Sequence, residues 1–234
     1  MTEFKDIQHD IDSCKDVWEG LYKIVYLNFF EKYFDFSNLR DYETSKTCKR
    51  WYIKLRNDIE IKKEFPKFKM AGDCIFNFNE NKINKLNKYV KNSKEGQVLL
   101  EKCAKYHYSF ENFAFMPITG GMNNQKGRNA LDRPDIHINE IRKHFAKEDS
   151  KIFKNLRYNL KALEWYLSIF NGDINKYLKE VYLINDKTFI NKFIEFANVE
   201  VKDELSAINY MNLALEFWKI RKNNIDNLMK LNSK

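Results

Sequence analysis

Apolar residues along most of the chain recur at steps of three and four positions, which is the period of an amphipathic α-helix. Serine, aspartate or asparagine stands before several of these segments, and each of these residues can cap a helix. Three prolines and seven glycines leave few positions that would interrupt one. The pattern predicts helices over residues 12–34, 45–61, 82–90, 94–106, 137–145, 150–170 and 203–221.

Several residues indicate where the later helices begin and end. Ser150 and Asp203 are expected to cap the two longest of them. Gly172 is expected to end the first, because glycine readily adopts a left-handed backbone conformation. Asp173 then begins a short helix, and the polar residues 222–234 are expected to fray.

Two short segments depart from the helical period. Cys74, Phe76 and Phe78 alternate with their neighbours, which is typical of an extended segment. The apolar run at 113–118 could form a second strand, or a helix end stopped by its proline. We therefore expect a mainly α fold, a single helical domain with at most a two-stranded β element from about 74–78 and 113–118.

The chain shows neither an internal repeat nor a linker rich in proline, glycine or serine, so one compact domain over 1–234 is expected. A connection at 112–135 joins an N-terminal helical half, 1–111, to a C-terminal half, 136–234. No apolar run approaches the roughly 18 residues that span a bilayer. The first residues lack the order of a signal peptide. A cytoplasmic protein without membrane contact is the expectation.

The cysteines do not indicate a metal site. Zinc sites normally bring at least two cysteines or histidines close together in sequence. The four cysteines here are far apart, and no histidine flanks them at ligand spacing: Cys14, Cys48, Cys74 and Cys103. We expect reduced, mostly buried thiols, no metal ligands and no cofactor.

The net charge of +8 and the pI near 9.1 favour a polyanionic partner, although scattered lysines from an AT-rich bacterial or phage genome would give the same total. Lys49–Arg56 interleaves basic and aromatic residues, as strand-clamping surfaces do. On the helix expected there, however, its cations would simply face water.

The stretch from Asn112 to Asp135 holds three of the seven glycines and two of the three prolines. A structural hypothesis assigns it ordinary turn chemistry, with Asp132 or Asp135 capping the next helix and Arg133 paired to a carboxylate. An anion-binding hypothesis has its backbone N–H groups and nearby cations hold phosphates. That hypothesis gives these candidate ligand-binding residues: Asn112, Thr119, Asn123, Asn124, Lys126, Arg128, Arg133, Arg142 and His144.

Two other functions compete with anion binding. "ENFAFMPITGGMNNQKG" is similar to the second half of a His-Asn-His nuclease finger, but no histidine precedes it at the required distance. Many aromatic residues and lysines could instead form the surface of a protein-binding regulator or inhibitor of the kind that mobile elements and phages carry. We name no catalytic residue.

Three blocks resemble a widespread family of uncharacterised bacterial proteins, over roughly residues 34–190. They are "FDF" followed by "SKTCKRWY", then "NNQKG" leading to "DRPDIHINEIRKHF", and "LEWYLSIFNGDINKYLKEVYLIND". The resemblance implies a shared architecture and brings no activity. The leading hypothesis is non-catalytic binding of a polyanion, above all nucleic acid, through the loop at 119–133 and the basic side of the 137–145 helix. A protein-binding regulator is second and a metal-dependent nuclease third.

Overall fold

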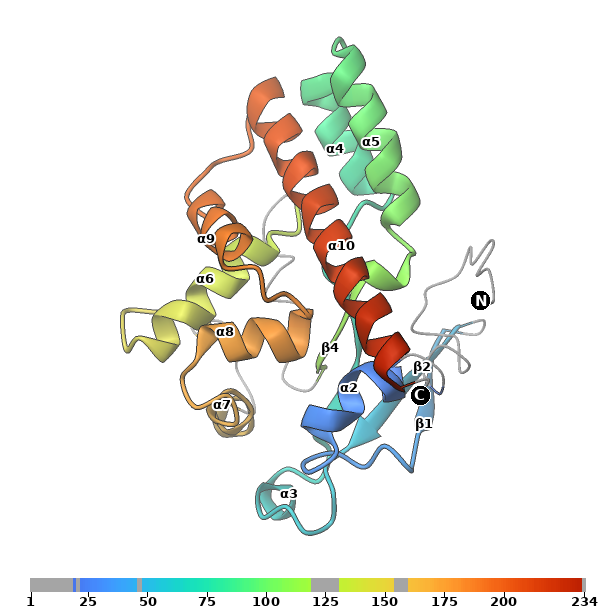
Figure 1. The fold of residues 1–234 in the computed structure, drawn as a ribbon, viewed down its shortest axis with the longest axis vertical. Coiled ribbons are helices and arrows are strands. Elements are labelled where there is room, and N and C mark those ends of the chain that lie inside the picture. The colour runs from blue at the N-terminus through green and yellow to red at the C-terminus, as the bar shows by residue number, and fades with distance from the viewer. Residues whose placement is uncertain (1–18, 20–21, 46–47, 119–130, 154–159, 233–234) are drawn as a thin grey trace.

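The computed structural model describes residue 19 and residues 22–45, 48–118, 131–153 and 160–232. These residues form a mainly helical fold around a small sheet, with the long last helix running past most other elements (Figure 1). In chain order the elements are α2 Lys23–Phe30, β1 Arg40–Ser45, β2 Cys48–Lys54, α3 Ile61–Glu64, β3 Lys69–Cys74, α4 Glu80–Val90, α5 Lys94–Tyr106, η3 Phe110–Asn112, β4 Phe113–Pro117, α6 Pro134–Phe145, α7 Leu160–Ser168, α8 Ile174–Tyr177, η5 Leu178–Tyr182, α9 Lys187–Phe196 and α10 Glu204–Asn232.

The sheet has four antiparallel strands in the order β1-β2-β3-β4, so the expectation of at most two strands is wrong. The strand expected at 113–118 is confirmed as β4. The segment expected at 74–78 lies almost wholly beyond β3, which pairs with β4 from Met70↔Pro117 to Cys74↔Phe113. Ile75 and Phe76 follow the end of this ladder and are buried. Their backbone N–H groups donate to Asn112 instead, to its carbonyl and to its Oδ1 respectively.

The helix expected over 45–61 is also wrong, because most of that segment forms the end of β1 and all of β2. Trp51, Ile53 and Leu55 are spaced by two and lie in or beside β2, with Ile53 and Leu55 buried. Their alternation is the period of a strand. Trp51, Leu55 and Ile59 also recur at steps of four, and this spacing led to the expectation of a helix.

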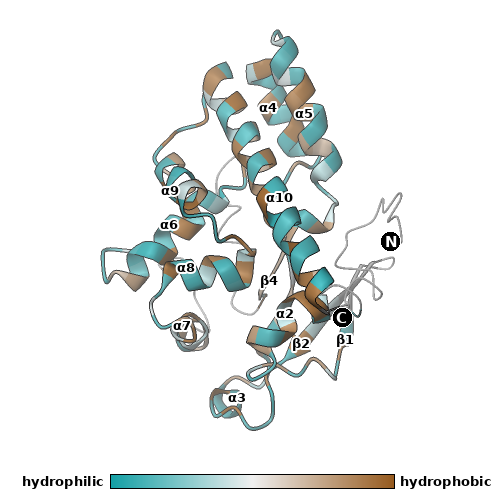
Figure 2. Ribbon diagram, in the orientation of Figure 1, coloured by the Kyte–Doolittle hydropathy of each residue, from teal (hydrophilic) through white to brown (hydrophobic). Residues whose placement is uncertain are grey.

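The core joins the sheet to the helices. Phe115 of β4 contacts aromatic rings of α2, with centroid distances of 5.4 Å to Tyr26 and 5.2 Å to Phe30. β4 also lies against η5, a π-helix. The α4–α5 hairpin packs on α10, and all three helices carry hydrophilic residues alongside the hydrophobic ones that pack (Figure 2). One hydrophobic cluster therefore runs through the sheet, α2 and α10.

The roles expected for Gly172, Asp173 and Asp203 at helix ends are confirmed. Asn79 and Ser93, for which no role was predicted, cap α4 and α5 by accepting hydrogen bonds from backbone N–H groups. Gly172 has a φ of +69° in the turn after α7, and Asp173 caps α8. The Asp203 carboxylate accepts a hydrogen bond from the Ser206 backbone N–H, at the start of α10.

Two expected helix ends are wrong. Ser150 begins no helix, since its hydroxyl donates to the Glu140 carbonyl and Ile152 and Phe153 form a turn. Residues 222–232 do not fray, since α10 continues to Asn232. Ile225 is buried on that last part, and Asn224 donates to the Leu183 carbonyl at 2.7 Å, so tertiary contacts hold a polar helix end.

Among the described residues, no helix combines the length and apolar character needed to cross a membrane. Cys103 is fully buried, and this burial raises the pKa of its thiol far above the usual range. Cys74 is half-buried and, like Cys103, is not in a disulfide. Cys14 and the side chain of Cys48 lie outside the described part of the chain.

Candidate functional site

Asn112, the first candidate of the anion-binding hypothesis, is fully buried and its side-chain amide is saturated. Its Oδ1 accepts from the Phe76 backbone N–H and from Trp218 Nε1, both at 2.9 Å. Its Nδ2 donates to the carbonyls of Phe76 at 2.7 Å and His107 at 2.9 Å. Asn112 therefore fastens η3 to the segment after β3 and to α10, and a surface ligand cannot reach it.

Arg133 is also occupied within the protein. Its side chain is 7% exposed, and Nη2 lies 2.6 Å from Oδ2 of Asp135, whose side chain is 0% exposed. Nε donates to both carboxylate oxygens, and Nη2 also donates to the Phe196 carbonyl at 3.0 Å. This confirms the pairing of the structural hypothesis. The expected carboxylate cap is wrong, because α6 begins at Pro134 after Arg133, with no side-chain cap.

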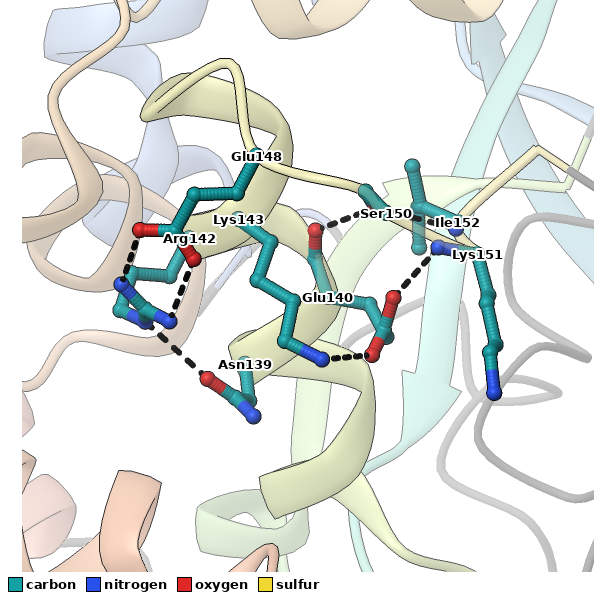
Figure 3. A network of polar contacts seen from close by, with 8 residues as sticks. All are labelled: Asn139, Glu140, Arg142, Lys143, Glu148, Ser150, Lys151 and Ile152. Atoms are coloured by element: carbon teal, nitrogen blue, oxygen red, sulfur yellow. Dashed lines mark hydrogen bonds and ion pairs between the residues drawn. The ribbon is translucent and has the colours of Figure 1, made fainter.

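The basic side of α6 is neutralised by the protein's own acids, as Figure 3 shows. Arg142 donates to both carboxylate oxygens of Glu148 and to Asn139 Oδ1 at 3.0 Å. Lys143 Nζ lies 2.8 Å from Oε1 of Glu140. Partial burial by itself raises the pKa of Glu140, but hydrogen bonds from Lys143 and the Lys151 backbone outweigh it and hold this pKa below its ordinary value.

His144 is half-buried at the end of α6, with its ring edge-on to Phe153 at a centroid distance of 5.0 Å. The structure thus brings Arg142 and His144 onto one helix, whereas Asn112 and Arg133 are interior residues. The remaining candidates lie outside the described residues: Thr119, Asn123, Asn124, Lys126 and Arg128. The whole 112–135 stretch carries three basic and two acidic residues, a net charge of only +1.

A stronger concentration of positive charge lies on the α4–α5 hairpin. Residues 79–108 carry seven lysines and three glutamates, a net charge of +4. Five of the lysines recur at every third position from Lys82 to Lys94, and Glu80 is the one acid between Asn79 and Lys94. This segment was not among the predicted sites, because each of its helices has the pattern of an ordinary amphipathic helix. The regular lysine spacing was the available signal.

The lysines at the tip of the hairpin are available to a partner. Lys88, Lys91 and Lys94 are exposed, and none forms an ion pair within the described part of the chain. Lys82 differs, because its Nζ lies 3.3 Å from Asp132. The two helices pack closely where they meet, since a Cβ on Gly96 would come within 2.5 Å of Val90 Cβ. Lys88, Lys91 and Lys94 therefore lie at the end of a closely packed helix pair.

The hairpin also carries exposed aromatic rings. Among the described residues, the three most exposed aromatic side chains all lie on or just after the hairpin: Tyr89, Tyr106 and Tyr108. Cations next to exposed aromatic rings are the combination that holds nucleic-acid strands, because phosphates and bases are bound by different groups. Among the described residues the hairpin carries both cations and exposed rings, whereas in the described part of 112–135 the aromatic rings are buried and Arg133 is paired.

A second basic region lies around β2, α3 and β3, where residues 54–69 carry a net charge of +3. Several of its cations already have partners. Arg56 pairs with Asp58 at 3.2 Å, and Lys62 Nζ donates to the Leu55 carbonyl. Lys69 Nζ lies 4.2 Å from the centre of the Tyr52 ring and covers it. This region therefore offers fewer free cations and no comparably exposed ring.

A groove of a different character, enclosing about 410 Å³, lies between α2, η5 and α10. It adjoins Leu183, whose φ of +56° is rare for a large side chain, and the π-helix η5; both features concentrate at functional sites. One lysine and one glutamate balance its charge, and amides alternate with apolar groups. Its lining residues are Val25, Asn28, Phe29, Lys179, Glu180, Leu183, Asn185, Asn224, Asn227, Leu228 and Leu231.

The nuclease hypothesis finds no support in the described residues. No three histidine, cysteine, aspartate or glutamate side chains in them lie close enough to hold a metal ion. His107, the histidine nearest to the proposed finger, is buried and its Nδ1 accepts a hydrogen bond from the Phe78 backbone N–H. The side-chain amide of Asn112, which belongs to the same segment, has all its hydrogen bonds within the protein.

Known proteins add nothing to this picture. No protein-family model, no curated protein and no solved structure matches the chain. The resemblance to an uncharacterised bacterial family stays a prediction.

Proposed function

We propose that the protein binds nucleic acid without catalysis, through the outer surface of the α4–α5 hairpin. The observation that carries the proposal is the set of three exposed lysines at its tip, Lys88, Lys91 and Lys94, which form no ion pair among the described residues and lie close in sequence to the exposed ring of Tyr89. A polyanion gains affinity from such a set because each phosphate contact releases condensed counterions. This replaces the loop at 119–133 and α6 as the main contact, since the described cations there are already paired.

Changing Lys88, Lys91 and Lys94 together to glutamine tests the proposal. We expect affinity for a single-stranded oligonucleotide to fall on the order of 100-fold at 50 mM salt. The slope of log affinity against log salt should become shallower by about 2, since each lost contact removes about 0.7. Fluorescence anisotropy with a labelled oligothymidylate from 50 to 300 mM NaCl measures both quantities.

The matched control changes Lys147, Lys187 and Lys230 to glutamine. These lysines are exposed, lie outside the hairpin and form no ion pair among the described residues, so the variant has the same net charge. It should keep the wild-type slope and nearly all of the affinity. Equal losses in the two triple variants would show that only total charge matters, and the hairpin would then not be the interface.

The groove between α2, η5 and α10 favours a second candidate function, that of a protein-binding regulator. Primary amides such as those of Asn28 and Asn227 can donate to and accept from a peptide main chain, and neighbouring leucines suit apolar side chains. Because the charges of this groove balance, binding there should change little with salt. The salt titration therefore separates the two functions.

A further inference from the structure

We infer that the Tyr106 ring is a preformed stacking platform for a nucleic-acid base, so the hairpin selects single-stranded over double-stranded nucleic acid. This inference rests on the proposed function and specifies its substrate class. Tyr106 ends α5 and is 37% exposed. Its ring lies parallel to the Trp218 indole, with an interplanar angle of 13° and centroids 5.2 Å apart. Trp218 therefore covers one face of the ring, while Tyr106 as a whole keeps more than a third of its surface exposed.

The support beneath this ring is fixed. Trp218 is 1% exposed, and its Nε1 donates to the saturated amide of Asn112 at 2.9 Å. Phe76 and Phe78 meet the same indole edge to face, at 5.6 and 5.7 Å. An aromatic side chain that is already stacked on its inner face loses little conformational freedom when a base covers its outer face, so a base gains more by binding there.

Two exposed lysines lie close to the platform in the chain. Lys102 precedes Tyr106 by one helical turn, and Lys105 is adjacent to it; both are exposed. Farther along the hairpin are the unpaired lysines of its tip. A single strand can place its phosphates on these lysines while one unpaired base lies on Tyr106. A duplex keeps its bases stacked inside, so it can use the lysines alone.

Tyr108 is the natural comparison. It is similarly exposed, at 40%, but its ring is tilted by 57° to the neighbouring His107 ring, and no described residue places a parallel ring beneath it. The structure therefore assigns the stacking role to Tyr106 and not to exposed tyrosines in general.

The test compares Tyr106→Leu, Tyr106→Phe and Tyr108→Leu on a labelled oligothymidylate and on a duplex of equal length. Tyr106→Leu should weaken single-strand binding between about fivefold and a hundredfold, the range for losing one base–aromatic stack. Duplex binding should change less than about twofold, because phosphate contacts remain. Tyr106→Phe keeps an aromatic ring at position 106, and Tyr108→Leu leaves Tyr106 unchanged. The affinities of both variants should therefore stay within about twofold of wild type on both substrates.

Wild-type protein with labelled tyrosine rings gives a second readout if Tyr106→Leu fails to fold. Stacking should shift the Tyr106 ring resonances upfield on adding oligothymidylate, and their loss in Tyr106→Phe identifies them. Unchanged resonances, or equal losses on single strand and duplex, would overturn the stacking role while salt-dependent binding still stood. Absence of salt-dependent binding to either substrate would instead overturn the proposed function.

Discussion

Replacing Arg133 with methionine is expected to lower the free energy of unfolding by about 3–5 kcal/mol, the cost of leaving one partner of a buried ion pair alone. Asp135 is fully buried, and the hydrogen bonds that the structure gives its carboxylate all come from Arg133. Methionine has a similar length but donates nothing, so the charge of Asp135 would stay in the interior without compensation. Urea denaturation at neutral pH measures the change.

Two controls separate this effect from a general role of arginine on or beside α6. Arg142→Met breaks a pair with Glu148 whose side chains are 33% and 49% exposed, so it should cost less than about 1 kcal/mol. Combining Arg133→Met with Asp135→Leu should recover most of the lost stability, because the buried charge disappears with its partner. A cost below 1 kcal/mol for Arg133→Met, or no recovery in the double variant, would contradict the buried-pair role.

Replacing Asn112 with alanine is expected to cost about 4 kcal/mol or more, because it removes four buried hydrogen bonds at once. The Phe76 N–H and C=O, the His107 C=O and the Trp218 indole N–H would each lose a partner. A buried polar group left unsatisfied costs about 1–3 kcal/mol. The variant should therefore unfold at much lower urea or fail to accumulate as folded protein.

The matched control for this variant is Asn84→Ala. Asn84 is exposed on α4, and the change should alter the free energy of unfolding by less than about 0.5 kcal/mol. A similarly small effect for Asn112→Ala would show that water replaces the amide, and Asn112 would then not hold η3, β3 and α10 together.

Local chemistry made part of the fold predictable. Asn79, Ser93 and Asp173 cap helices through contacts within three residues, so their roles could be predicted from neighbours in the sequence. Strand pairing is different, because β3 and β4 are separated by the whole hairpin. β1, with the sequence RDYETS, has no apolar alternation to mark it as a strand. Its place depends on β2 and not on its own residues.

The candidate site shows the same limit. Glycines, asparagines and cations at 112–135 do indicate a crowded turn, and the pairing of Arg133 with a carboxylate was predictable from Asp135 two residues away. The burial of Asn112 was not, because it depends on Phe76 and Trp218, which are far away in the chain. The hairpin lysines could be counted in the sequence. The sequence does not show that the lysines at the tip form no ion pair among the described residues, or that Tyr106 lies on Trp218. Both depend on how α5 packs against α10.

The most direct measurement of where nucleic acid binds is photocrosslinking to an oligothymidylate that contains 4-thiothymidine, followed by mass spectrometry of the cross-linked peptides. Binding through the hairpin predicts cross-links within residues 79–108, with Tyr106 among the modified residues, and their loss at high salt. Cross-links confined to residues 112–145 or 40–69, with none on the hairpin, would contradict the proposed interface.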